Sequence, residues 1–175
     1  MIQDFCDKMF CINLDNRHDR WNRVQKEFGR IGVSPERFSA IKHEHGRTGC
    51  RMSHQAVIKK AKDSNWDRVL IFEDDVLFHP DALMVFDSAI RQLPEEWDLL
   101  YFGCIWGTSE PYTLNLSKIV SCKLGHAVIF NKSSYDMALA SKEKSMDRTN
   151  LLIHPMGRSF CVSPMIAQQE DKRVW

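Results

Sequence analysis

Long apolar runs are missing from this sequence of 175 residues, and none approaches the roughly 20 residues that cross a bilayer. The first eight residues, Met1 to Lys8, carry two acids and no apolar stretch of signal-peptide length. We therefore expect a protein without a transmembrane segment and without an export signal.

Paired cysteine motifs are also missing. The six cysteines include no C-x-x-C pair, and most of them lie within apolar stretches: Cys6, Cys11, Cys50, Cys104, Cys122 and Cys161. Zinc binding and disulfide formation stay open as alternatives, but the pattern favours buried free thiols in a reducing compartment. We expect a cytoplasmic location.

A strong charge of one sign is the third absence. The chain has 24 basic and 23 acidic residues, for a formal net charge of +1. No long-range field draws the whole molecule to nucleic acid or to an anionic membrane, although a local basic patch stays open. With no internal repeat or linker, residues 1–175 are predicted to form one domain.

Apolar runs of strand length alternate with segments of helical period. Strands are predicted at residues 9–14, 38–41, 69–72, 99–102 and 127–130, helices at 17–28, 49–62, 81–93 and 133–141, and a loop at 106–117. This alternation predicts an α/β fold with a mostly parallel central sheet flanked by helices. Ligands bind beyond the carboxyl ends of such strands, so we expect the site just after Leu14, Phe72, Phe102 and Phe130.

An acidic turn, Glu73-Asp74-Asp75, follows the most apolar predicted strand. Three consecutive carboxylates repel one another, so solvent or a cation must offset their charge. If strand alternation persists, Glu73 and Asp75 point to the same side. Their hard oxygens suit Mg²⁺ or Mn²⁺; a solvated strand end is the alternative.

Two arginines stand at the start of the first predicted helix, Arg17 and Arg20. Free N–H groups at a helix start attract anions, so the arginines indicate a nucleotide or phosphate partner. The alternative is an ion pair between Asp19 and Arg23, with Arg20 on an exposed face.

Three polar side chains fall at positions that the pattern predicts to be buried. Ser53 and His54 lie on the apolar face of the helix at 49–62, and His126 opens the strand at 127–130. Each could contact a ligand, or could be a core side chain with satisfied hydrogen bonds.

Five segments, in this order, resemble glycosyltransferase family 25, the group of lipooligosaccharide-biosynthesis and collagen galactosyltransferase enzymes. The segments are Cys11-Ile12-Asn13-Leu14-Asp15-Asn16-Arg17-His18-Asp19-Arg20-Trp21, Gly49-Cys50-Arg51-Met52-Ser53-His54, Val69-Leu70-Ile71-Phe72-Glu73-Asp74-Asp75-Val76, Trp97-Asp98-Leu99-Leu100-Tyr101-Phe102-Gly103 and Gly125-His126-Ala127-Val128-Ile129. The chain departs from the family pattern at His18, where a proline is common, and before Gly49, where an acid is expected.

The resemblance implies a GT-A fold, a nucleotide-sugar donor (a UDP-sugar) and Mn²⁺ or Mg²⁺. Asp75 would be the principal metal ligand, and Glu73 would support the metal shell or the donor ribose. The resemblance places the other donor-binding residues at Asn13, Leu14, Arg17, Arg20, Ser53, His54, Asp74 and His126.

The implied reaction inverts the configuration at the anomeric carbon of the sugar, so a carboxylate should deprotonate an acceptor hydroxyl. The resemblance indicates Asp147 as this base, with Asp98 and Glu170 as alternatives. The acceptor would be a glycan or another hydroxyl-bearing molecule, a modified base included, while nucleic acid itself is disfavoured. Two other functions stay open: a non-catalytic nucleotide-sugar-binding relic, and a metal-dependent phosphoryl-transfer enzyme with Asp15 as nucleophile.

Overall fold

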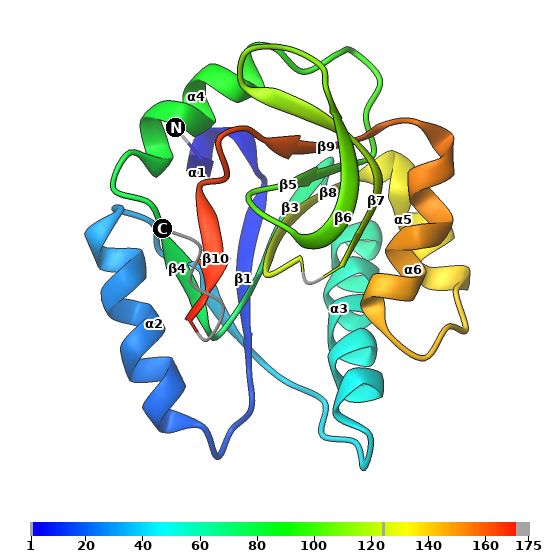
Figure 1. Cartoon of the computed structure of the whole chain (residues 1–175). Coiled ribbons are helices and arrows are strands. Elements are labelled where there is room, and N and C mark those ends of the chain that lie inside the picture. Colours follow the sequence, from blue (N-terminus) through cyan, green and yellow to red (C-terminus); the bar gives the residue numbers. More distant parts are fainter. Residues whose placement is uncertain (1, 124, 171–175) are drawn as a thin grey trace.

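A computed structural model describes residues 2–123 and 125–170. Its centre is an eight-stranded sheet in the order β2-β1-β3-β8-β5-β9-β7-β6, and β4 and β10 form a small second sheet (Figure 1). The strands are β1 Lys8–Asn13, β2 Glu36–Ser39, β3 Arg68–Glu73, β4 Val76–Phe78, β5 Leu99–Tyr101, β6 Ile105–Pro111, β7 Leu116–Lys123, β8 Ala127–Asn131, β9 Ser159–Val162 and β10 Ala167–Gln169. The α-helices are α1 Ile2–Phe5, α2 His18–Arg30, α3 Gly46–Asp63, α4 Ala82–Ile90, α5 Tyr135–Ala140 and α6 Met146–Ile153, with short 3-10 helices η1 Lys132–Ser134 and η2 His154–Met156.

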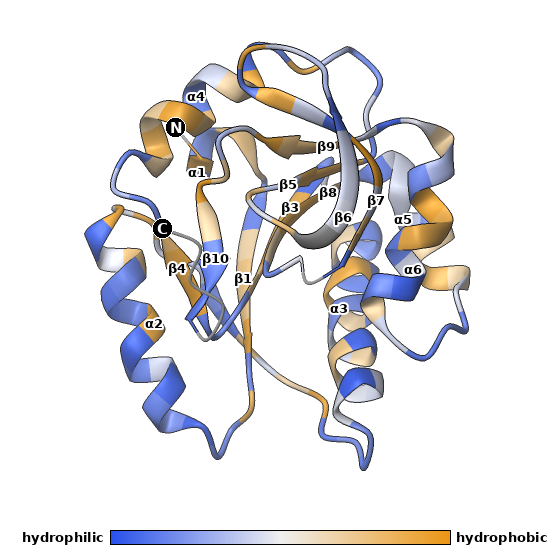
Figure 2. Cartoon of the chain, viewed as in Figure 1, coloured by the Kyte–Doolittle hydropathy of each residue, from blue (hydrophilic) through white to orange (hydrophobic). Residues whose placement is uncertain are grey.

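Alternate residues of the central strands pack into two hydrophobic cores, one on each face of the sheet. Leu70 and Phe72 belong to the core that contains residues of α2 and α4, whereas Val69 and Ile71 belong to the core under α3. Figure 2 shows the apolar colour along these strands and the polar colour on the outer side of α2. Burial on both faces explains why the predicted strands read as continuous apolar runs.

The predicted α/β class is confirmed, but the sheet is mixed, so the expectation of a mostly parallel sheet is wrong. β1 pairs in parallel with β2 and β3, whereas β8 lies antiparallel between β3 and β5. An apolar run such as residues 127–130 fits a buried strand in either direction, so the sequence did not fix its direction. Because β8 is antiparallel to β3, the residues that precede β8 lie near Glu73: the Glu73 N–H donates to the His126 carbonyl (2.9 Å). The residues that follow Phe130 lie at the opposite edge of the sheet, so the expectation of a site just after Phe130 is wrong.

The prediction of a loop at residues 106–117 is wrong, because most of this segment lies in the hairpin of β6 and β7. Pro111 and the hydroxyl residues suggested a loop. In the part of the chain that the structure describes, however, β6 lies at the edge of the sheet, and an edge strand tolerates proline because one of its sides has no partner strand. Residues 107–111 are exposed, so the segment lacks the apolar alternation that reveals an interior strand.

The end of the chain contributes elements that the sequence did not reveal. β9 and β10 follow β8, although no strand was predicted after residue 130, and α6 was also unforeseen. Among residues 2–123 and 125–170, no helix combines the length and apolar character needed to cross a bilayer.

Candidate functional site

A cavity of about 380 Å³ opens where β1 and β3 end, between the sheet, α3 and α6. This volume lies within the range of small-molecule sites. Most of the predicted site residues line it: Leu14, Arg17, Arg20, Ser53, His54, Glu73, Asp74, Asp75 and Asp147. The expectation of a site after Leu14 and Phe72 therefore coincides with a cavity.

The acidic turn leaves the strand geometry immediately after Glu73. β3 ends at Glu73, and Asp74 and Asp75 form the turn into β4, so strand alternation does not continue through the three acids. Asp74 is held on both sides: Asn13 Nδ2 donates to Oδ2 (2.7 Å) and Arg20 Nη1 to Oδ1 (2.8 Å). Asp75 Oδ2 lies 3.5 Å from the same guanidinium nitrogen.

The carboxylate of Glu73 points toward α3. Cys50 Sγ donates to Oε1 (3.5 Å), and Gln169 Nε2 donates to Oε2 (3.2 Å). Burial, followed by the charges of Asp75 and Asp147, raises the pKa of Glu73 to about 8. A bound cation would offset this negative charge.

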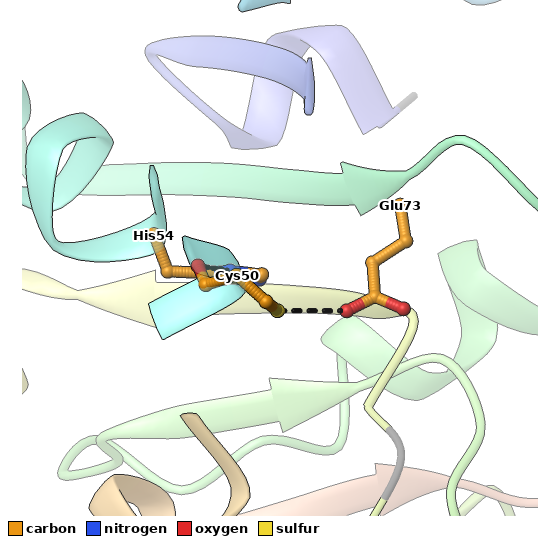
Figure 3. A group of neighbouring side chains, drawn as sticks. All are labelled: Cys50, His54 and Glu73. Carbon is orange, nitrogen blue, oxygen red and sulfur yellow. Dashed lines mark hydrogen bonds between the residues drawn. The ribbon is translucent and has the colours of Figure 1, made fainter. Parts of the chain in front are cut away.

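Glu73 also belongs to a group that could hold a metal ion. Its carboxylate, the Cys50 thiol and a ring nitrogen of His54 lie within 4.8 Å of one another. Figure 3 shows the three side chains, with the hydrogen bond between Cys50 and Glu73. Burial, followed by the Glu73 charge, raises the pKa of the Cys50 thiol, whereas burial lowers the pKa of His54. His54 Nδ1 lies 3.0 Å from the Cys50 carbonyl oxygen, so His54 has a hydrogen-bond partner as well as a position in the cavity wall.

The Ser53 hydroxyl links the segment before α3 to the helix through two hydrogen bonds. Its hydroxyl donates to the Gly49 carbonyl (2.7 Å) and accepts from the Ile41 N–H (2.8 Å), and its side chain is fully buried. Ser53 therefore shapes the cavity wall while its own hydrogen bonds are made within the protein.

The two predicted arginines line the cavity, each with a carboxylate partner. Arg17 makes two hydrogen bonds to Asp19 (2.9 and 2.7 Å), and Arg20 contacts the acidic turn. The alternative pair of Asp19 with Arg23 is wrong, because Arg23 pairs with Glu170 (2.8 Å). Asp19 lies in the first turn of α2, within reach of the arginine that precedes the helix.

Among the three candidate bases, only Asp147 lines the cavity. It lies in the first turn of α6. Asp98 is buried before β5, where it accepts from Arg158 (2.9 and 3.0 Å) and from Ser133 (2.6 Å). Glu170 pairs with Arg23, as described above.

Two predicted donor-binding residues lie behind the cavity wall. Asn13 is buried. Its Nδ2 donates to Asp74, and its Oδ1 accepts from Arg37 Nε (2.9 Å). His126 is fully buried at the start of β8, close to Gly103. Neither side chain is part of the cavity lining.

Sequence reasoning missed Cys50 and Gln169. Cys50 was expected to be a buried thiol, although its spacing of four residues from His54 on a helix places both on one face and could have revealed the pair. Gln169 reaches Glu73 from 96 residues away, and no local pattern could have revealed this contact. All six cysteines are free; Cys6, Cys11, Cys122 and Cys161 are buried as predicted, whereas Cys50 and Cys104 have intermediate exposure.

Residues 44–152 match the family described as glycosyltransferase family 25 (LPS biosynthesis protein). The chain belongs to glycosyltransferase family 25. The matched segment contains the acidic turn, Cys50, His54 and Asp147, so most of the cavity wall lies within it. The predicted family resemblance is confirmed.

The chain also resembles individual proteins. A glycosyltransferase 25 family member of Drosophila pseudoobscura pseudoobscura is 27% identical over 148 residues, which cover 65% of this chain and 23% of that protein. Procollagen galactosyltransferase 2 of Homo sapiens is 27% identical over 128 residues, which cover 55% of this chain and 20% of that protein. The chain thus spans about a fifth to a quarter of these curated relatives.

The fold agrees with this assignment. The structure of a glycosyltransferase involved in glycosylation of the major capsid of PBCV-1 superposes with a TM-score of 0.58 at 12% identity, and the match covers 88% of this chain and 79% of that one. Family 25 membership and this likeness confirm the predicted GT-A-like fold.

Proposed function

We propose that the chain is a single GT-A-like domain that transfers a sugar from a UDP-sugar to an acceptor hydroxyl, in the cytoplasm. The observation that carries the proposal is the shared cavity: it brings the acidic turn and Asp147 together in a family 25 chain, although 72 residues (147 − 75) separate Asp75 from Asp147. A GT-A-like fold with a cavity at the strand ends is suited to a nucleotide-sugar.

The residues of the acidic turn fit a divalent cation with hard ligands, Mn²⁺ or Mg²⁺. Asp74 is held by Asn13 and Arg20, so we assign the coordination to Asp75, supported by Glu73. When bound, the cation supplies positive charge that stabilises the departing diphosphate. Arg17 and Arg20, at the cavity wall, are suited to the nucleotide phosphates.

Asp147 is assigned the removal of the acceptor proton. It lines the cavity from α6, whereas the acidic turn lies at the end of β3 and in the connection to β4. In an inverting transfer the base and the leaving diphosphate stand on opposite faces of the sugar, so the two groups must come from separate walls. A glycan or another hydroxyl-bearing molecule is the proposed acceptor.

The phosphoryl-transfer alternative has less support. Asp15, the nucleophile that it would need after the first strand, is exposed and accepts from Arg37 Nη2 (2.9 Å) and Ser39 Oγ (2.7 Å). It is not among the residues that line the cavity.

A thermal-shift screen of UDP-sugars, each with and without Mn²⁺, tests the proposal. A ligand at about 100 times its dissociation constant adds about 2.7 kcal/mol to the free energy of unfolding, which raises Tm measurably. Asp75→Asn should lose the part of the shift that depends on Mn²⁺. Asp63→Asn, an exposed acid of α3 that pairs with Lys59, is the control and should keep it.

Three results would redirect the proposal. Equal shifts in Asp75→Asn and in the unchanged chain would refute the metal assignment. Metal-dependent UDP binding without donor hydrolysis or transfer would indicate the non-catalytic relic. Hydrolysis of a simple phosphoester, with no response to UDP-sugars, would favour phosphoryl transfer.

A further inference from the structure

We propose that Cys50, His54 and Glu73 form a second cation site at the cavity wall, selective for a borderline-soft divalent ion of the zinc class. This site goes beyond the proposed sugar transfer, because a magnesium or manganese site has no need of a thiol or an imidazole. The site also joins two elements: Cys50 and His54 lie on successive turns of α3, and Glu73 ends β3 (Figure 3).

The two distances from the Cys50 sulfur match tetrahedral coordination. Zinc–sulfur bonds of about 2.3 Å and zinc–nitrogen or zinc–oxygen bonds of about 2.0–2.2 Å, at tetrahedral angles, separate the sulfur from the other ligand atoms by about 3.5–3.7 Å. Cys50 Sγ lies 3.5 Å from Glu73 Oε1 and 3.6 Å from His54 Nδ1. The Glu73 oxygen and the His54 nitrogen lie within 4.8 Å of each other, so a bound ion would draw these two atoms together while both distances to sulfur already fit.

The ligand types determine which ion the site prefers. Thiolate and imidazole favour zinc and chemically similar ions, whereas Mg²⁺ and Mn²⁺ favour oxygen ligands. His54 Nδ1 would exchange its contact with the Cys50 carbonyl oxygen for the ion, with the ring proton on Nε2.

The surroundings support the proposed ligands. Gln169 Nε2 donates to Glu73 Oε2 (3.2 Å) and so directs Oε1 toward Cys50, as outer hydrogen bonds commonly do at metal sites. All three ligand residues line the cavity. The fourth coordination position would therefore face the cavity and accept water or an oxygen of a bound molecule, as in zinc sites with three protein ligands.

Cobalt(II) is the probe for this site, because it takes zinc-like coordination and reports sulfur ligation by absorbance. The full chain is treated with a chelator, freed of it and titrated with Co²⁺. We expect a thiolate-to-cobalt charge-transfer band in the near ultraviolet, together with the visible bands of tetrahedral cobalt, and loss of both when Zn²⁺ is added. A titration without these bands would overturn the proposal.

Cysteine variants show which thiol binds the cobalt ion. Cys50→Ser should lose the near-ultraviolet band, and Glu73→Gln should weaken Co²⁺ binding at least about tenfold. Cys6→Ser, which removes a buried thiol outside the cavity, is the matched control and should keep both properties. Cys104→Ser examines a second thiol of intermediate exposure. A band that survives Cys50→Ser and disappears in Cys104→Ser would place the metal elsewhere.

A measurement on the unchanged chain covers the case in which Cys50→Ser fails to fold. Zn²⁺ should slow the alkylation of Cys50 by N-ethylmaleimide but not that of Cys104, as mass spectrometry of the peptides would show. Equal alkylation of Cys50 with and without Zn²⁺ would overturn the proposal. Cobalt bands without any response to UDP-sugars would support this site and refute the sugar-transfer proposal, so the two outcomes are distinguishable.

Discussion

At the scale of single residues, Glu73 combines a strand end, a half-buried carboxyl and two proposed cation contacts. The Cys50 thiol and the Gln169 amide satisfy its oxygens in the described structure, while Asp75 and Asp147 add negative charge nearby. Among the residues that the structure describes, Glu73 is therefore held by a thiol and an amide, whereas Asp74 is held by the cationic Arg20. This contrast between neighbours leads to a prediction about pH.

The stability of the metal-free protein should fall as pH rises toward 8 because of Glu73. Its pKa is raised from 4.5 to about 8 on folding, so between these values the folded state holds a proton that the unfolded state has lost. The contribution of Glu73 to the free energy of unfolding is fully present below about pH 4.5 and is lost as the pH rises through about 8. The Tm difference between the unchanged chain and Glu73→Gln should shift in favour of Glu73→Gln over this window. A constant difference would contradict the assignment.

Asp147 is the residue whose replacement should affect turnover most. Asp147→Asn removes the proposed base while keeping its shape, so kcat should fall about 10²–10⁴-fold and the Kd for the UDP-sugar should change little. The measurement is UDP release with an acceptor that supports transfer. Asp136→Asn is the control, because Asp136 is an exposed acid of α5 that pairs with Lys62. Turnover within twofold of the unchanged chain would exclude Asp147 as the base.

At the scale of elements, the site depends on close approach between segments distant in sequence. Beyond the end of β5, Gly103 lies against the backbone of Ala167, and a Cβ at Gly103 would meet the Ala167 oxygen at 2.0 Å. The Ile166 N–H donates to the Phe102 carbonyl (2.8 Å) in the same region. This contact holds the segment that carries Gln169 near the acidic turn.

Gly103→Ala should destabilise the protein, whereas Gly29→Ala should not. The new methyl at Gly103 has no space, and overpacking of this kind costs about 1–3 kcal/mol. A Cβ at Gly29, in α2, meets no atom within 4 Å, so alanine should stabilise the helix by about 0.5–1 kcal/mol. Urea unfolding of both variants measures the difference. Equal midpoints would show that the segment after β5 can move away from Ala167.

At the scale of the whole molecule, stability should be concentrated in the centre of the sheet. β1, β3, β8 and β5 are covered on both faces by the two cores, whereas β6 is an edge strand with exposed residues at 107–111. Amides that open only on global unfolding should therefore lie in the central strands.

Hydrogen exchange measures this distribution. Amides of β3 and β8 should exchange slowest, and those of residues 107–110 should exchange much faster, because local opening of an edge hairpin exposes little apolar surface. Exchange of the hairpin amides at the rate of the β3 amides would show that β6 and β7 unfold only with the core.

The sequence by itself determined the elements whose patterns are local. Continuous apolar runs predicted β1, β3, β5 and β8, because strands covered on both faces need apolar side chains at every position. Helical spacing predicted α2 and α3 for the same reason of burial. The acidic turn was recognisable because three adjacent acids after a buried strand require compensation of their charge.

Only the tertiary structure decided which of these features meet. The direction of β8, the pairing of Arg20 with Asp74 and the approach of Gln169 to Glu73 depend on the path of the chain between distant residues. The same holds for Cys50 and Glu73, which are 23 residues apart and lie on different elements. A hydrophobic pattern fixes which face of an element is buried, but the identity of the side chain opposite it is set by packing of the whole domain.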